Sequence, residues 1–202
     1  MNTSFLFFVS LTNQEKKKLS SDDFRFEQFK RLLPSSSDYE KLDSYKHIDN
    51  KITFILNKLL RKKAIHSFIG NDEFQITTSS TGKPLVKDNI NIKFNMSNCI
   101  SENISTMIIN NQSVEVGIDI ADVNDHMGND DSFDHTLYKD ILSPIEMELL
   151  STQNFHNKIR LFALIWSVKE SYTKLLGVGL SHTDLSKVTV FSRDNQLDIN
   201  RR

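Results

Sequence analysis

The sequence predicts an α+β protein built from two halves. Residues 48–68 and 154–176 have apolar side chains at the three-and-four spacing of helices with one buried face. Shorter stretches, such as residues 74–77 and 107–109, have the apolar and β-branched side chains of strands. Both kinds of pattern occur on each side of residue 114, so we expect two α+β halves that meet there.

Composition sets limits on what these halves do. The chain has 202 residues, 38% of them hydrophobic, which is enough for one ordinary domain or two small ones. We place the halves at residues 1–113 and 114–202. With 25 basic and 26 acidic residues, the formal charge is -1, so neither nucleic acid nor an anionic membrane is an expected partner. Any anion site must be local.

Cysteine usage and the N-terminus favour a cytoplasmic protein. Cys99 is the single cysteine, which rules out an internal disulfide and a cysteine metal cluster and fits a reducing compartment. The apolar residues 5–9 lack a basic leader and a cleavage pattern, so we interpret them as a buried strand. No stretch approaches the roughly twenty apolar residues of a membrane span.

The remaining elements follow in order. We interpret residues 12–23 as a polar connection, followed by a helix over residues 24–33 and a turn with an N-cap at residues 35–38. The helix over residues 48–68 has a basic face, which is solvated or contacts a phosphate group, and the solvated interpretation is favoured. Alternation then predicts strands at the following positions: residues 74–77, 92–96, 107–109 and 114–120. A helix from about Ser143, a long helix ending at Gly177, and short strands near Val188 and Leu197 complete the chain.

Asp119 is the first candidate for chemistry. It interrupts the apolar run Val116-Gly117-Ile118-Asp119-Ile120. A carboxylate buried without a partner costs several kcal/mol, so this acid needs a cation or metal unless it is a strand-end residue exposed to water. The strand by itself leaves both possibilities open.

Glu170 and Lys174 are the second candidate pair. They lie four residues apart on the long helix, where a surface ion pair contributes only a few tenths of a kcal/mol. One or two carboxylates together with substrate phosphates often hold Mg²⁺. Asp119 and Glu170 are therefore candidate Mg²⁺ ligands, and Lys174 is a candidate phosphate contact.

These two motifs resemble the signature of the 4'-phosphopantetheinyl transferases. The chain has Gly117-Ile118-Asp119 and, about fifty residues later, Trp166-Ser167-Val168-Lys169-Glu170 with Lys174 four positions further on. The resemblance covers nearly the whole chain and implies two pseudo-symmetric α/β halves with coenzyme A in the cleft between them. It also implies that Asp119 and Glu170 bind the metal and that Lys174 contacts phosphate on the pantetheine side. Lys169 is then expected to contact phosphate as well.

Glu146 has two interpretations. Ser143-Pro144-Ile145-Glu146 is a capping box with proline at the first helical position, which is sufficient to explain the pattern. The resemblance implies instead that this glutamate is the base that accepts the proton of the carrier protein's serine. Both interpretations stay open at this point.

The N-terminal half contains two further resemblances. Gly82-Lys83-Pro84 matches a family tripeptide whose lysine contacts coenzyme A, although a turn with a solvated lysine is also common. Phe94-Asn95-Met96-Ser97-Asn98 matches a coenzyme A-binding segment through Ser97. Asn98 stands where the family has histidine and provides no positive charge.

The resemblance implies transfer of the phosphopantetheine arm of coenzyme A to a serine of an apo carrier protein. The subgroup it most resembles is the fungal enzyme that activates aminoadipate reductase in lysine biosynthesis. Ala121 departs from bacterial members, which often have a third acidic ligand there. The alternative is a non-catalytic relative that binds coenzyme A or a carrier protein.

The C-terminal strand pair gives one more expectation. Residues 188–191 and 197–199 predict two strands around a turn at residues 193–195. The family continues with a further strand, so we expect an uncovered sheet edge and a tendency to oligomerise.

Overall fold

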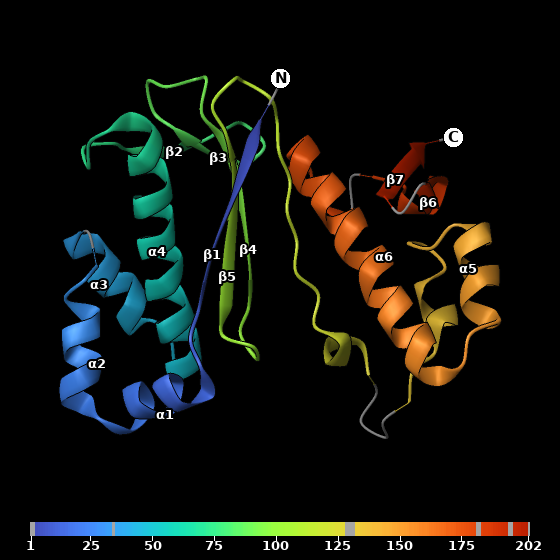
Figure 1. Cartoon of the computed structure of the whole chain (residues 1–202), viewed down its shortest axis with the longest axis horizontal. Coiled ribbons are helices and arrows are strands. Elements are labelled where there is room, and N and C mark those ends of the chain that lie inside the picture. Colours follow the sequence, from blue (N-terminus) through green and yellow to red (C-terminus); the bar gives the residue numbers. More distant parts are fainter. Residues whose placement is uncertain (1–2, 34, 128–131, 181–182, 194–195, 202) are drawn as a thin grey trace. The chain divides into compact units, whose positions relative to one another are not determined.

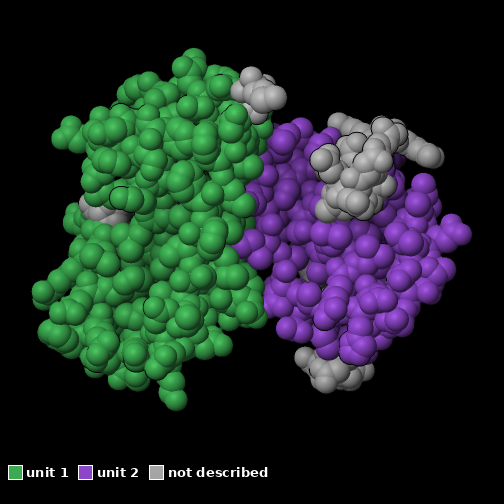
Figure 2. Space-filling view, viewed as in Figure 1, with its two compact units in different colours: residues 1–116 green, residues 117–202 purple. Residues whose placement is uncertain are grey.

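The chain divides into two compact units, residues 1–116 and residues 117–202, which are coloured separately in Figure 2. The computed structural model describes residues 3–33, 35–127, 132–180, 183–193 and 196–201. Among these residues, no helix is long and apolar enough to cross a membrane. Helices and small sheets occur in both units, in agreement with the predicted α+β class.

Unit 1 is built on a three-stranded antiparallel sheet. Its strand order is β1 (Ser4–Ser10), β5 (Ile104–Asn110), β4 (Lys93–Cys99). The long helix α4 (Ile48–Ile69) lies along this sheet, as Figure 1 shows. Apolar side chains of α4, β4 and β5 form one core: Leu60, Ala64, Ile65, Phe94, Met107 and Ile109. The helix predicted over residues 48–68 is confirmed.

Shorter elements complete unit 1. Three helices precede α4, namely α1 (Asn13–Ser21), α2 (Asp23–Lys30) and α3 (Ser36–Asp43). A hairpin of β2 (Ile76–Thr78) and β3 (Pro84–Val86) follows it. The prediction of a polar connection over residues 12–23 was wrong for α1. This helix begins with a capping box between Thr12 and Glu15 but buries no residue, so it has no apolar stripe to reveal it.

Two strand predictions require correction. Residues 5–9 form a strand, but it is not buried: β1 lies at one edge of the sheet, and Phe5, Leu6 and Phe8 on it are exposed, Phe8 by 71%. Residues 114–120 are not assigned to any strand. At the end of β5 the side chain of Asn110 accepts hydrogen bonds from the backbone of Gln112 (2.8 Å) and Val114 (3.2 Å), which turns the chain out of the sheet.

Unit 2 is built on two helices and a strand pair. The helix α5 (Pro144–Ser151) precedes α6 (Phe155–Leu176), and the antiparallel strands β6 (Val188–Arg193) and β7 (Gln196–Arg201) follow. Among the described residues of this unit, the 3-10 helices η1 (Val123–His126) and η2 (His135–Tyr138) precede α5, and η4 (Leu185–Lys187) precedes β6. These helices and strands confirm the predictions for this region. The predicted turn residues Asp194 and Asn195 lie outside the described residues.

The core of unit 2 lies on one side of α6. Its buried apolar side chains are Leu142, Leu150, Phe162, Ile165 and Val190. Gly177 ends α6 in the left-handed conformation (φ 71°), as its position after the last apolar residue predicts. This packing fixes α6, which contributes Lys169, Glu170 and Lys174.

Candidate functional site

Gly117 brings the Gly-x-Asp segment against the backbone of α6. A Cβ atom at this position would lie 2.0 Å from the carbonyl oxygen of Ser171 and 2.7 Å from the backbone nitrogen of Leu175. Both are backbone atoms of a helix and cannot move aside cheaply. Only glycine allows so close an approach, so Gly117 is required by contact with the helix rather than by its own backbone conformation.

Asp119 and Lys174 meet as a consequence of this approach. They are 55 positions apart in the sequence, and the Lys174 ammonium donates a hydrogen bond to the Asp119 carboxylate at 2.5 Å. Asp119 is 9% exposed and Lys174 is 29% exposed, so the pair lies at the surface of unit 2 with its acid mostly covered. The two sequence motifs therefore converge within one unit.

Glu170 lies within electrostatic range of the same pair. Burial raises the pKa of Glu170 above its ordinary value, and the Asp119 carboxylate raises it further. Lys174 and a hydrogen bond with Thr173 act in the opposite direction and offset part of this rise. Two acids of like charge and one ammonium thus share a small, partly covered region.

This arrangement fits a divalent cation. The described residues contain no group of three His, Cys, Asp or Glu side chains that would form a complete protein metal site. Mg²⁺, however, keeps several waters and is commonly held by one or two carboxylates plus substrate phosphates. The mutual repulsion of Asp119 and Glu170 is the property that a cation between them would relieve.

Lys169 and Glu146 lie on the buried side of α6, away from such a role. Each is 1% exposed, and the Lys169 ammonium is 2.6 Å from a Glu146 carboxylate oxygen. Both capping-box hydrogen bonds between Ser143 and Glu146 are present. These contacts favour the capping interpretation of Glu146 over the base, and they argue against a phosphate contact by Lys169.

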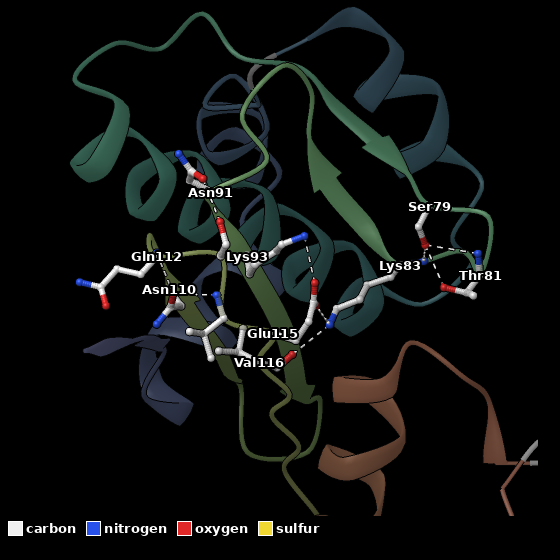
Figure 3. A network of polar contacts seen from close by, with 11 residues as sticks. Ser79, Thr81, Lys83, Asn91, Lys93, Asn110, Gln112, Glu115 and Val116 are labelled. Atoms are coloured by element: carbon white, nitrogen blue, oxygen red, sulfur yellow. Dashed lines mark hydrogen bonds and ion pairs between the residues drawn. The ribbon is translucent and has the colours of Figure 1, made fainter. Parts of the chain in front are cut away.

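In unit 1, Lys83 belongs to a network drawn in Figure 3. Its ammonium donates to the Glu115 carboxylate (2.5 Å) and to the carbonyl oxygen of Val116 (3.2 Å), and Lys93 approaches the other Glu115 oxygen at 2.9 Å. Burial would raise the pKa of Glu115, but Lys83 and Lys93 hold it below its ordinary value. A carboxylate thus already lies between two lysines at the position where a phosphate contact is expected.

Ser97 and Asn98 occupy neighbouring positions on β4. Ser97 is buried, and its carbonyl oxygen accepts a hydrogen bond from the Thr106 hydroxyl at 3.3 Å. Asn98 is exposed. The coenzyme A contact expected of Ser97 stays a prediction.

Sequence reasoning gave no role to Lys93 or Glu115. Neither lies in a recognisable motif, and they come together because β4 and the segment after β5 are neighbours in unit 1. Glu115 is a single charged residue between Val114 and Val116, which is not a specific sequence signal of this contact.

Comparison with known proteins connects this geometry to a family. Residues 115–200 match the model of the 4'-phosphopantetheinyl transferase superfamily, a stretch that contains Asp119, Glu170 and Lys174. The L-aminoadipate-semialdehyde dehydrogenase-phosphopantetheinyl transferase of Candida glabrata is 37% identical over 187 residues, which are 91% of this chain and 70% of that protein. The chain belongs to the 4'-phosphopantetheinyl transferase family. The predicted family, and with it a transferase enzyme, is confirmed.

A second phosphopantetheinyl transferase gives the same result at lower identity. The Saccharomyces cerevisiae protein of the same name is 29% identical over 180 residues, which are 86% of this chain and 63% of that protein. The chain thus spans 70% and 63% of the lengths of these two relatives. The reaction of the family is transfer of phosphopantetheine to carrier proteins, and the matched region contains the site of unit 2.

Proposed function

We propose that this chain transfers the 4'-phosphopantetheine arm of coenzyme A to a serine of an apo carrier protein domain. The observation that supports this proposal is the convergence of Asp119, Glu170 and Lys174 within unit 2. The relatives are named for L-aminoadipate-semialdehyde dehydrogenase, so the proposed substrate is the carrier domain of an aminoadipate reductase in lysine biosynthesis.

The reaction is a phosphoryl-type substitution on the pyrophosphate of coenzyme A. The serine oxygen forms a bond to the phosphorus on the pantetheine side, and the hydroxyl proton passes to bulk water. The bond from that phosphorus to the bridging oxygen breaks, and adenosine 3',5'-bisphosphate leaves with the bridging oxygen. Negative charge grows on the leaving phosphate, so the protein's main task is to position cations there.

Asp119 and Glu170 are the residues that would hold Mg²⁺. The metal, when bound, neutralises pyrophosphate charge and polarises the phosphoryl oxygens. Lys174 remains next to Asp119 and offers its ammonium to the phosphate on the pantetheine side. A 9% exposed Asp119 and a half-buried Glu170 also exclude part of the surrounding water, which strengthens these interactions.

Unit 1 is proposed to contribute contacts to coenzyme A through Lys83 and Ser97. The two pseudo-symmetric halves and the cleft implied by the resemblance belong to this proposal, as does a cytoplasmic location. Cys99, a buried free cysteine, is compatible with that compartment.

The test uses a purified apo carrier domain of an aminoadipate reductase, coenzyme A and Mg²⁺. Intact-mass spectrometry should show a gain of one phosphopantetheine arm, which chelation of the metal with EDTA abolishes and added Mg²⁺ restores. A carrier mutated at its acceptor serine is the control. Binding of coenzyme A by calorimetry without any mass gain would instead establish the non-catalytic alternative.

A further inference from the structure

A saturated buried ion pair joins α5 to α6. The Lys169 ammonium donates to Glu146 Oε2 (2.6 Å) and to the carbonyl oxygens of Ile141 (2.6 Å) and Leu185 (3.0 Å). An ammonium has three hydrogens, and here each of them has an acceptor. Lys169 is 1% exposed, so a phosphate oxygen cannot reach its ammonium, and no hydrogen of the ammonium is left to donate to it.

The Glu146 carboxylate is occupied just as fully. Its Oε2 atom accepts from the backbone nitrogen of Ser143 (2.7 Å) as well as from Lys169, and its Oε1 atom accepts from the backbone nitrogen of Val190 (2.8 Å). The pair therefore connects α6 to α5, to Ile141 before α5, to Leu185 of η4, and to β6. Removal of one partner from a buried pair leaves an uncompensated charge, which is strongly destabilising.

The position of Lys169 on α6 determines where its neighbours point. Ile165, Lys169 and Thr173 are spaced by four residues and are all buried, so they share one face of the helix. Glu170 follows Lys169 by one residue, a rotation of about 100°. Lys174 lies one turn after Glu170 on the same side. A fixed Lys169 therefore fixes the direction of both Glu170 and Lys174.

We propose that Lys169 and Glu146 are positioning residues of the transferase. Neither touches substrate; through the rotation of α6 they hold Glu170 and Lys174 beside Asp119. This inference rests on the proposed function of Asp119, Glu170 and Lys174. It assigns Glu146 and Lys169 a role other than general base or phosphate contact.

The first experiment uses the wild-type chain with ¹⁵N-labelled lysine. The Lys169 ammonium should give an NMR signal that exchanges slowly with water, assigned by its absence from the Lys169→Met spectrum. Coenzyme A with Mg²⁺ should shift the Lys174 signal and leave that of Lys169 nearly unchanged. A Lys169 ammonium that exchanges rapidly, or that shifts as much as Lys174, would overturn the proposal.

The second experiment compares Lys169→Met, Glu146→Gln and the double variant. Lys169→Met leaves the buried Glu146 carboxylate without its cation. Glu146→Gln offers a single acceptor oxygen to the three donors that the carboxylate binds. Each single variant should therefore lower the melting temperature by roughly 10 °C. Displacement of Glu170 should lower kcat roughly 100-fold, as small misplacements of reacting groups do. The double variant has no unpaired buried charge and should recover part of both losses.

The control is Arg160→Met, which removes an exposed cation from the same helix and should change neither quantity. A folded double variant that stays as inactive as Glu146→Gln would identify Glu146 as a base and reject the positioning role. A Lys169→Met variant with unchanged melting temperature and a raised KM for coenzyme A would identify a phosphate contact. Should the chain transfer nothing, slow ammonium exchange and the melting temperatures still test the pair by themselves.

Discussion

Two lysine-carboxylate pairs on α6 differ in almost every property except their composition. Lys169 and Glu146 are both 1% exposed, and every polar hydrogen and oxygen of the two side chains is directed at a partner. Lys174 and Asp119 are 29% and 9% exposed, and a second carboxylate, Glu170, lies close enough to repel Asp119. In the first pair all hydrogen bonds are satisfied without a ligand. Near the second pair two carboxylates repel each other, and a bound cation would relieve this repulsion.

This difference shows why sequence spacing alone does not identify a binding residue. Lys169 and Glu170 are adjacent in the same motif, yet Lys169 is buried and Glu170 interacts electrostatically with Asp119. The helical rotation between consecutive residues separates the two roles. The motif thus contains one residue that fixes the helix and one residue of the candidate site. Substitution of the first should lower stability, and substitution of the second should lower turnover.

The largest expected effect is loss of turnover in Asp119→Ala and Glu170→Ala. Each removes a charge from the metal shell, so kcat/KM should fall roughly 1,000-fold. Glu170→Ala should not lower the melting temperature, because it also removes a half-buried acid that is repelled by Asp119. Enzyme kinetics and thermal melts measure both quantities. Glu148→Ala, at an exposed glutamate of α5, is the control and should change neither quantity. Near-normal turnover in a folded Asp119→Ala would reject the metal assignment.

Gly117→Ala should have the next largest effect. A Cβ atom 2.0 Å from the Ser171 carbonyl oxygen forces the Asp119 segment away from α6, so kcat should fall roughly 100-fold. The melting temperature should fall too, in contrast to Glu170→Ala. Gly70→Ala, at the end of α4 in unit 1, has open space around it but a positive φ (79°), so it should lower the melting temperature and leave kcat unchanged. Full activity in Gly117→Ala would show that the close approach is unnecessary.

Lys174→Met separates the open pair from the buried one. This pair is only partly covered (29% and 9% exposed), so its loss should lower the melting temperature less than loss of the fully buried Lys169 does. A charge-assisted hydrogen bond to phosphate contributes about 1.5–3 kcal/mol, so KM for coenzyme A should rise at least about tenfold. Lys174→Arg keeps the charge and should restore part of the affinity. A large loss of stability in Lys174→Met would mean that both pairs are structural.

The sequence predicted those features that depend on local patterns. Apolar spacing located α4 and α6, and the Ser143 capping box located the start of α5. Apolar spacing did not locate α1, because this helix buries no residue. For residues 114–120 it predicted a strand, because alternating apolar side chains do not distinguish a paired strand from a segment lying on a helix. The resemblance paired Asp119 with Glu170, and the two carboxylates lie within electrostatic range of each other. Long-range contacts, however, decide which of their neighbours are buried. The partners of Lys169 lie 16 to 28 positions away and follow no periodic rule.

The smallest expected effect extends the comparison to unit 1, where Glu115 lies between Lys83 and Lys93. Burial alone would raise the pKa of Glu115, but the two ammonium groups lower it below its ordinary value. A carboxyl group whose pKa is lowered by folding stabilises the folded state at any pH above its unfolded pKa, and this stabilisation is lost as the pH falls through the folded pKa. Wild type should therefore be more stable than Glu115→Gln at pH 7, by a few tenths of a kcal/mol because the group is well exposed to screening solvent.

Urea unfolding at pH 7, 5 and 3 should show this difference shrinking toward zero at the lowest pH. Glu102→Gln, at an exposed glutamate beside the same sheet, is the control and should show no such difference. A difference that stays constant over this range would mean that the stability comes from packing of the side chain and not from its charge between the two lysines.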